Sequence, residues 1–187
     1  LAMIELQTNL GIPSLQLGLL KENDSQMGLS GSGALNGQGN QLTSFLGITN
    51  SMDVFGGKLF GSLYWGQTAD SKNETGMISA INDIRSSSFG LGYLKNSIFQ
   101  KNDLLTFTID QPIRVESGNL NLEVPVYRTK KKNVLFNSLD INLSPSGREI
   151  NSKLEYSSTY KILNYGVALG YKSDPYHIKY MDDYWYV

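Results

Sequence analysis

The sequence predicts an all-β protein: an antiparallel up-and-down β-barrel of about 10–12 strands, or an incomplete part of one, with little helix. Three observations lead to this fold class. Apolar and polar residues alternate along most of the second half of the chain. Turn signals rich in Gly, Ser, Pro and Asn separate the alternating segments. No apolar run approaches the roughly 20 residues that a membrane helix needs.

The composition agrees with β-structure and narrows the possible partners. The chain of 187 residues contains 19 glycines and 11 tyrosines, and it has no cysteine, which excludes disulfides and thiol chemistry. Its formal net charge of −1 gives no reason to expect a nucleic-acid partner. We expect a single β-barrel domain over residues 1–187. The absence of an initial Met and of an export signal predicts a fragment of a longer chain.

The first half of the chain holds the less regular strand candidates. These are residues 14–20, 41–49, 58–66 and 87–94. A turn is expected at residues 55–58 (FGGK), and one short helical turn at residues 75–87. The Gly/Ser/Asn-rich segment 22–40 is either a loop or partly a Gly-rich strand.

The second half alternates more cleanly. Strands are expected within residues 105–115, 120–126, 135–143, 150–162 and 165–171, and the aromatic segment 179–187 is expected to begin another strand. Residues 128–133 (RTKKKN) form a charged loop in this scheme, and residues 144–147 (SPSG) form a tight turn.

Ser117 and Gly118 look like the two-residue loop of a long hairpin. In that register Val115 faces Leu120, and the apolar sides of both strands coincide. The apolar set from Leu105 to Val115 would span roughly 36 Å at about 3.3 Å per residue. Membrane strands need about 9–11 residues, whereas soluble strands average about 5–6, so the length favours a barrel over a sandwich.

The hairpin would have one polar and one apolar side. The polar side faces either bulk water or a barrel lumen, and carries Asp110, Arg114, Glu116, Asn121 and Glu123. The apolar side faces either lipid or a protein core, and carries Leu105, Phe107, Ile109, Leu120, Leu122 and Val124. Pairing of Arg114 with a carboxylate is expected on the polar side. Pro112 cannot donate to the ladder, which predicts a bulge or a sheet edge there.

Residues for catalysis are scarce. The single histidine, His177, has no G-x-S-x-G serine elbow to activate, so a loop or interface role is favoured over catalysis. The Gly-rich segment lacks the spacing of a phosphate-binding loop. No catalytic residue, cofactor site or metal site is therefore expected, and the chain is not expected to be an enzyme.

Four blocks carry a resemblance to a known family. They are LLKENDSQMGLSGSGAL (19–35), QPIRVESGNLNLEVPV (111–126), LDINLSPSGREINSKLEY (139–156) and YKSDPYH (171–177). Together they resemble the C-terminal translocator region of bacterial autotransporter-like proteins, whose passenger is often a subtilisin-family serine protease. The resemblance implies a β-barrel that anchors and helps to export an upstream passenger. None of the protease motifs is present, so protease activity is not implied for this chain.

The resemblance also implies partners and a location. These are outer-membrane lipid, a covalently attached passenger domain, the barrel-assembly machinery and the bacterial outer membrane. The residues by themselves leave an alternative open, a soluble all-β binding or accessory module of a secreted or periplasmic protein.

Overall fold

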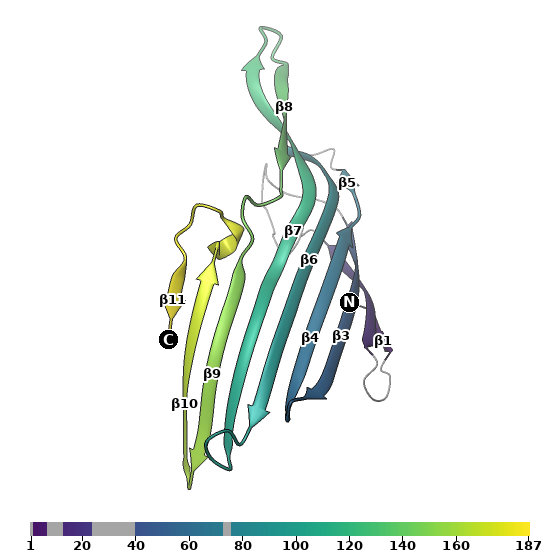
Figure 1. Cartoon of the computed structure of the whole chain (residues 1–187). Helices are drawn as coiled ribbons and strands as arrows, with labels where there is room; N and C mark the ends of the chain where they lie inside the picture. Colours follow the sequence, from purple (N-terminus) through teal and green to yellow (C-terminus); the bar gives the residue numbers. More distant parts are fainter. Residues whose placement is uncertain (1, 7–12, 24–39, 73–75) are drawn as a thin grey trace.

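The computed structural model describes residues 2–6, 13–23, 40–72 and 76–187, which form one antiparallel sheet (Figure 1). The sheet contains 11 strands, and the helical segment of the described residues is one 3₁₀ turn, η2 (Pro175–His177). The predicted all-β antiparallel fold with about 10–12 strands is therefore confirmed.

The strands vary widely in length. They are β1 (Ala2–Leu6), β2 (Ser14–Asn23), β3 (Asn40–Val54), β4 (Gly57–Thr68), β5 (Ser71–Lys72), β6 (Ile78–Asn96), β7 (Asp103–Arg128), β8 (Val134–Asn142), β9 (Ile150–Tyr160), β10 (Leu163–Ser173) and β11 (Tyr184–Tyr186). The strand candidates at 14–20, 41–49, 58–66 and 87–94 all lie inside these strands. Most of the Gly-rich segment 22–40 lies outside the described residues.

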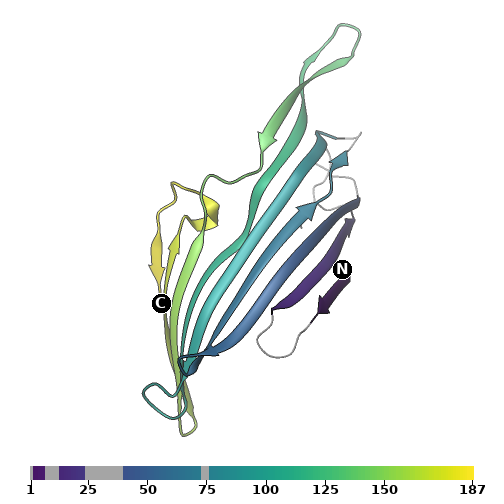
Figure 2. The same cartoon turned by 45° about the vertical axis from the view of Figure 1, so that its right-hand side comes forward.

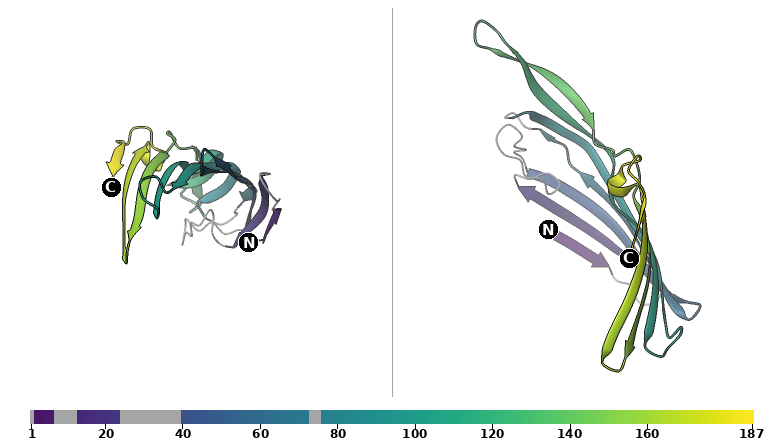
Figure 3. Two further views of the ribbon diagram at one scale, coloured as in Figure 1. Left: turned by 60° about the horizontal axis from the view of Figure 1, so that its bottom comes forward. Right: turned by 90° about the vertical axis from the view of Figure 1, so that its left-hand side faces the viewer.

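The sheet is an open arc. Its order is β1-β2-β3-β4-β6-β7-β9-β10-β11, with β5 added to β6 and β8 added to β7. The left view of Figure 3 shows the arc end-on, with the two termini at opposite ends. Ring closure, which the sequence analysis predicted for a complete barrel, is not seen, because β1 and β11 are the two edges of the described sheet.

Two of the predicted connections are confirmed. Phe55 and Gly56 join β3 to β4 with φ values of 52° and 72°, the two positive φ angles of a type I′ hairpin turn. The charged loop at 129–133 joins β7 to β8. The upper part of β7 and β8 form a two-stranded hairpin that projects beyond the rest of the sheet (Figure 2).

The predicted hairpin turn at Ser117 and Gly118 is wrong. Both residues lie inside β7, a continuous strand of 26 residues that pairs with β6 along most of its length. Gly118 is closely packed there, since a Cβ on it would lie 3.1 Å from Cγ1 of Ile84. The helical turn predicted at 75–87 is also wrong, because β6 begins at Ile78.

Bulges interrupt the pairing of β6 with β7. The register passes from Phe89 opposite Gln111 to Ser87 opposite Arg114, so one extra residue of β7 is inserted next to Pro112. This confirms the predicted bulge, and its cause is the missing N–H of proline. A second extra residue lies at Glu116, because Ser86 pairs with Val115 and Arg85 with Ser117. Each insertion exchanges the sides to which the following side chains point.

Candidate functional surfaces

Strand pairing gives the sheet two chemically different faces, since directly paired residues point to the same side. One row of paired residues crosses the sheet from β2 to β10 and is almost entirely polar. It consists of Ser14, Thr49, Ser62, Gly90, Asp110, Asn151 and Lys172. We call this side the polar face.

The opposite side is the apolar face. One of its rows consists of Leu17, Leu46 and Trp65, the next of Leu15, Ile48, Leu63 and Phe89, and a third of Met52, Leu59, Tyr93, Phe107, Leu154 and Leu169. The two faces follow directly from the period-2 alternation that the sequence shows.

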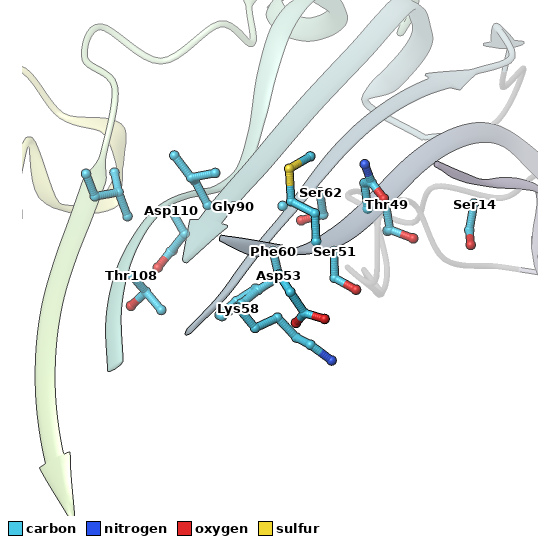
Figure 4. Close-up of a pocket in the computed structure, with 15 residues that line it drawn as sticks. Ser14, Thr49, Ser51, Asp53, Lys58, Phe60, Ser62, Gly90, Thr108 and Asp110 are labelled. Atoms are coloured by element: carbon cyan, nitrogen blue, oxygen red, sulfur yellow. The ribbon is translucent and has the colours of Figure 1, made fainter. Parts of the chain in front are cut away.

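The polar face is hollowed. A depression of about 940 Å³ is lined by side chains from β3, β4 and β7, among them Thr49, Asp53, Lys58, Ser62 and Asp110. Figure 4 shows these side chains around the same space. A hollow that extends over several neighbouring strands indicates that the sheet curves toward its polar face. The apolar face is then on the convex side of the arc.

The apolar face has no protein covering it within the described residues. Leu63 is 45% exposed, Trp65 46% and Phe107 43%, and Leu91, Leu154 and Leu169 are similarly exposed. The buried hydrophobic side chains of the described residues are only Ile81 and Ile84, near the upper end of β6. Contiguous exposed apolar surface of this kind marks an interaction site.

A polar cluster interrupts the apolar face beside the first bulge. The guanidinium of Arg114 donates to the carbonyl oxygens of Gly147 (2.9 Å) and Pro145 (2.9 Å), and it forms an ion pair with Glu116. Arg148 binds the same Glu116 oxygen at 2.9 Å. The expected pairing of Arg114 with a carboxylate is confirmed, and Glu116 is the partner.

Two further residues complete this cluster. Ser87 donates to the other oxygen of Glu116 at 2.5 Å. Gln111, which is 2% exposed, accepts a hydrogen bond from Arg148 and donates to the carbonyl oxygen of Ser87 at 3.2 Å. The cluster fastens residues 145–148 to β7 and β6.

The five residues predicted on one polar side do not lie together. Asp110 is on the polar face, but Arg114 pairs with Ser87 and so follows the apolar face. Glu116 borders the same groove as Leu17 and Trp65. The remaining two lie on the projecting hairpin, where Asn121 pairs with Asp140 and Glu123 with Ser138. The two bulges cause this separation, because the alternation restarts after each of them.

The six residues predicted on one apolar side also divide into two groups. Leu105, Phe107 and Ile109 are on the apolar face. Leu120 pairs with Ile81, whereas Asn119 continues the side of Ser117 and Arg85. Leu120, Leu122 and Val124 therefore lie on the other side of the sheet, in the hairpin with β8. The predicted hairpin register places all six residues on one face, whereas the continuous strand β7 places the two groups of three on opposite faces.

A clamp that the sequence analysis missed secures the segment before β9. His177 Nδ1 accepts from the N–H of Glu149 at 2.9 Å, so its Nε2 carries the proton and donates to the carbonyl oxygen of Ile113 (3.1 Å). Glu149 binds Lys172 at 2.9 Å and the N–H of Tyr176 at 2.6 Å. The histidine thus joins η2 to the bulge of β7, which fits the predicted structural role.

The carboxyl group of Glu149 is held in its charged form. Burial disfavours the charge, but the hydrogen bonds from Lys172 and from the N–H of Tyr176, with the charge of Lys172, outweigh it and lower the pKa. Glu149 lies in the connection between β8 and β9 and is only 5% exposed. Its contacts are structural and include no nucleophile.

The described residues offer little for chemistry. Within the ranges given above, no group of three or more His, Asp or Glu side chains could hold a metal ion. No helix in the described part of the chain is long and apolar enough to cross a membrane.

Comparisons with known proteins leave the family of the chain open. No protein-family model matches the sequence, and neither the curated proteins nor the solved structures contain a match.

Proposed function

We propose that this chain is the wall of an outer-membrane β-barrel, the non-catalytic anchor and translocator portion of an autotransporter-like surface protein. The observation that carries the proposal is the pair of opposite faces. A convex apolar face without a protein cover and a concave polar face are what a barrel wall presents to lipid and to its lumen. The four resembling blocks supply the autotransporter part of the proposal and its expected partners, a passenger domain and the barrel-assembly machinery.

The dimensions of the apolar face agree with a bilayer. On β3, Leu42 and Met52 both lie on the apolar face, ten positions apart. This distance is about 33 Å along the strand. At a tilt of about 40° it projects to about 25 Å, the height of the apolar band of outer-membrane barrels.

Fluorescence quenching tests the proposal directly. The chain has 2 tryptophans, so Trp185→Phe leaves Trp65 as the only tryptophan, whose emission can be excited selectively. We expect Trp65 in reconstituted vesicles to be quenched strongly by lipids with brominated acyl chains and weakly by aqueous iodide. A matched control carries Thr49→Trp on the polar face with both native tryptophans replaced by Phe, and it should show the reverse pattern.

The same samples distinguish the alternative of a soluble module. If the chain keeps its β-structure in buffer without detergent or lipid, and Trp65 is insensitive to brominated lipid, the membrane proposal is wrong. A secreted or periplasmic accessory role would then account for the polar hollow.

A further inference from the structure

Two hollows on the outer side of the sheet meet at Arg85. The first is a mainly apolar groove of about 490 Å³, bordered by Leu17, Leu46, Trp65 and Arg85. The second is a polar hollow of about 340 Å³, bordered by Arg85, Asn119, Asn142 and Ser144. Arg85 is a lining residue of both. The two hollows together form an amphipathic site with a cation between its halves.

Arg85 lies in a mixed row near the end of the apolar face. The row contains Leu19, Ser44, Gln67 and Ser117, whereas the adjacent row contains Leu17, Leu46 and Trp65. Leu42 lies one row further along β3 on the same face, so Arg85 is inside the apolar band and near its end. A long arginine side chain near that end can reach the level of the lipid headgroups.

The guanidinium of Arg85 is available for a ligand. Arg85 is exposed, and the described part of the chain provides no ion pair or hydrogen bond for its side chain. Glu116 borders the same groove, but Ser87, Arg114 and Arg148 already bind its two oxygens. Arg114 and Arg148 are paired with Glu116, so Arg85 is the cation of the two hollows that has no partner among the described residues.

We propose that this site binds one diacyl phospholipid, with its phosphate on Arg85 and an acyl chain along Leu17, Leu46 and Trp65. Arginine recognises phosphate through two parallel N–H donors, which makes it well suited to this role. The hydroxyl of Ser144 already donates to the carbonyl oxygen of Glu116, and the amide oxygen of Asn142 accepts from the N–H of Ser144. The amide of Asn119 and the NH₂ group of Asn142 can bind the remaining polar atoms of the headgroup. The inference rests on the proposed membrane function and adds the identity of a specific ligand to it.

Asp83 selects among headgroups. Asp83 borders the polar hollow together with Arg85, and the two form no ion pair with each other. A headgroup that carries an ammonium next to its phosphate matches this arrangement of one cation and one anion. We therefore expect an ethanolamine phospholipid to bind more tightly than a phospholipid with a glycerol headgroup.

The test measures lipid retention on the full chain in detergent micelles by native mass spectrometry. Dioleoyl phosphatidylethanolamine is titrated against dioleoylglycerol, which lacks the phosphate, and against glycerophosphoethanolamine, which lacks the acyl chains. We expect one molecule of the complete phospholipid to be retained. Each truncated probe should bind at least about tenfold more weakly, because each lacks one half of the interaction.

Two variants and one control complete the design. Arg85→Gln should weaken retention about tenfold by removing the charged donor, and Trp65→Ala should weaken it by removing one wall of the groove. Arg128→Gln, at the far end of β7, removes the same charge outside both hollows and should have no effect. Equal retention by Arg85→Gln and the unmodified chain overturns the lipid site. If that chain still needs detergent to remain folded, the barrel proposal survives the loss of the lipid site.

Discussion

At the scale of single residues, Glu149 has the most consequential electrostatics outside the strands. Its lowered pKa means that folding favours the charged form. The stabilisation is fully present above the ordinary pKa of a glutamate in the unfolded chain, and it disappears as the pH falls through the lower pKa of the folded state. The clamp around His177 should therefore weaken in acid.

Glu149→Gln tests this contribution. The substitution keeps an acceptor for the N–H of Tyr176 but removes the charge that binds Lys172, and we expect a loss of about 1.5–3 kcal/mol at pH 7. Urea titration of the folded chain in micelles at pH 7 and at pH 3 measures it. The difference between variant and parent should shrink at pH 3, and an equal difference at both pH values would contradict the assigned role of the carboxylate.

At the scale of strands, glycines and aromatic rings are paired across the polar face. A Cβ on Gly18 would lie 2.1 Å from Cζ of Phe45, and a Cβ on Gly92 would lie 2.2 Å from Cζ of Phe60. Gly47 and Gly170 lie in the same way beneath tyrosine rings of the next strand. An aromatic ring that covers a glycine joins two strands and fixes their register.

Gly92→Ala should force the Phe60 ring away from β6 and cost about 1–3 kcal/mol. Gly61→Ala is the matched control, because its new Cβ meets only ordinary contacts, the nearest at 3.4 Å. Thermal unfolding of both variants in the same detergent compares them. A loss for Gly61→Ala as large as that for Gly92→Ala would show that the ring contact is not the cause.

The strands also show what the sequence could and could not predict. The alternation of apolar and polar residues located most of the strands. Successive side chains of a strand point to opposite faces, and here one face is apolar and the other polar. Ser117 and Gly118 were misread because the same two residues can form a turn or sit inside a bulged strand. The strand interpretation is correct because β6 pairs with β7 on both sides of these two residues. The sequence did not indicate this pairing, because β6 begins in the segment that was predicted as a helical turn.

The polar cluster was predictable only in part. Pairing of Arg114 with a carboxylate was expected, and the structure shows that the partner is Glu116. Arg148 lies in a connection after β8, so the sequence offered no sign that it reaches Gln111. Similarly, the bond from His177 to Ile113 depends on how η2 folds back across β7. Irregular segments have no periodic sequence pattern, so their contacts cannot be predicted from the sequence in the way that strand faces can.

At the scale of the whole molecule, the open arc has two edges whose backbone groups remain available for pairing. The edge strand β11 pairs with β10 through only Gly170, Tyr171 and Lys172. Exposed edges promote association between chains, and closed barrels remove them. Together with the apolar convex face, this predicts that the chain aggregates in buffer and stays dispersed in detergent or lipid, which light scattering of the two samples compares.

The two faces also predict opposite responses to the same substitution at neighbouring positions. Ser62 lies on the polar face and Leu63 on the apolar face of β4. In a bilayer, Leu63→Arg should cost about 2–4 kcal/mol because the guanidinium enters hydrocarbon, whereas Ser62→Arg should change stability little because it points into the polar hollow. Urea titration of both variants in vesicles measures the difference. In water the half-exposed Leu63 could be replaced at small cost, so equal stabilities of the two variants would show that the apolar face does not meet lipid.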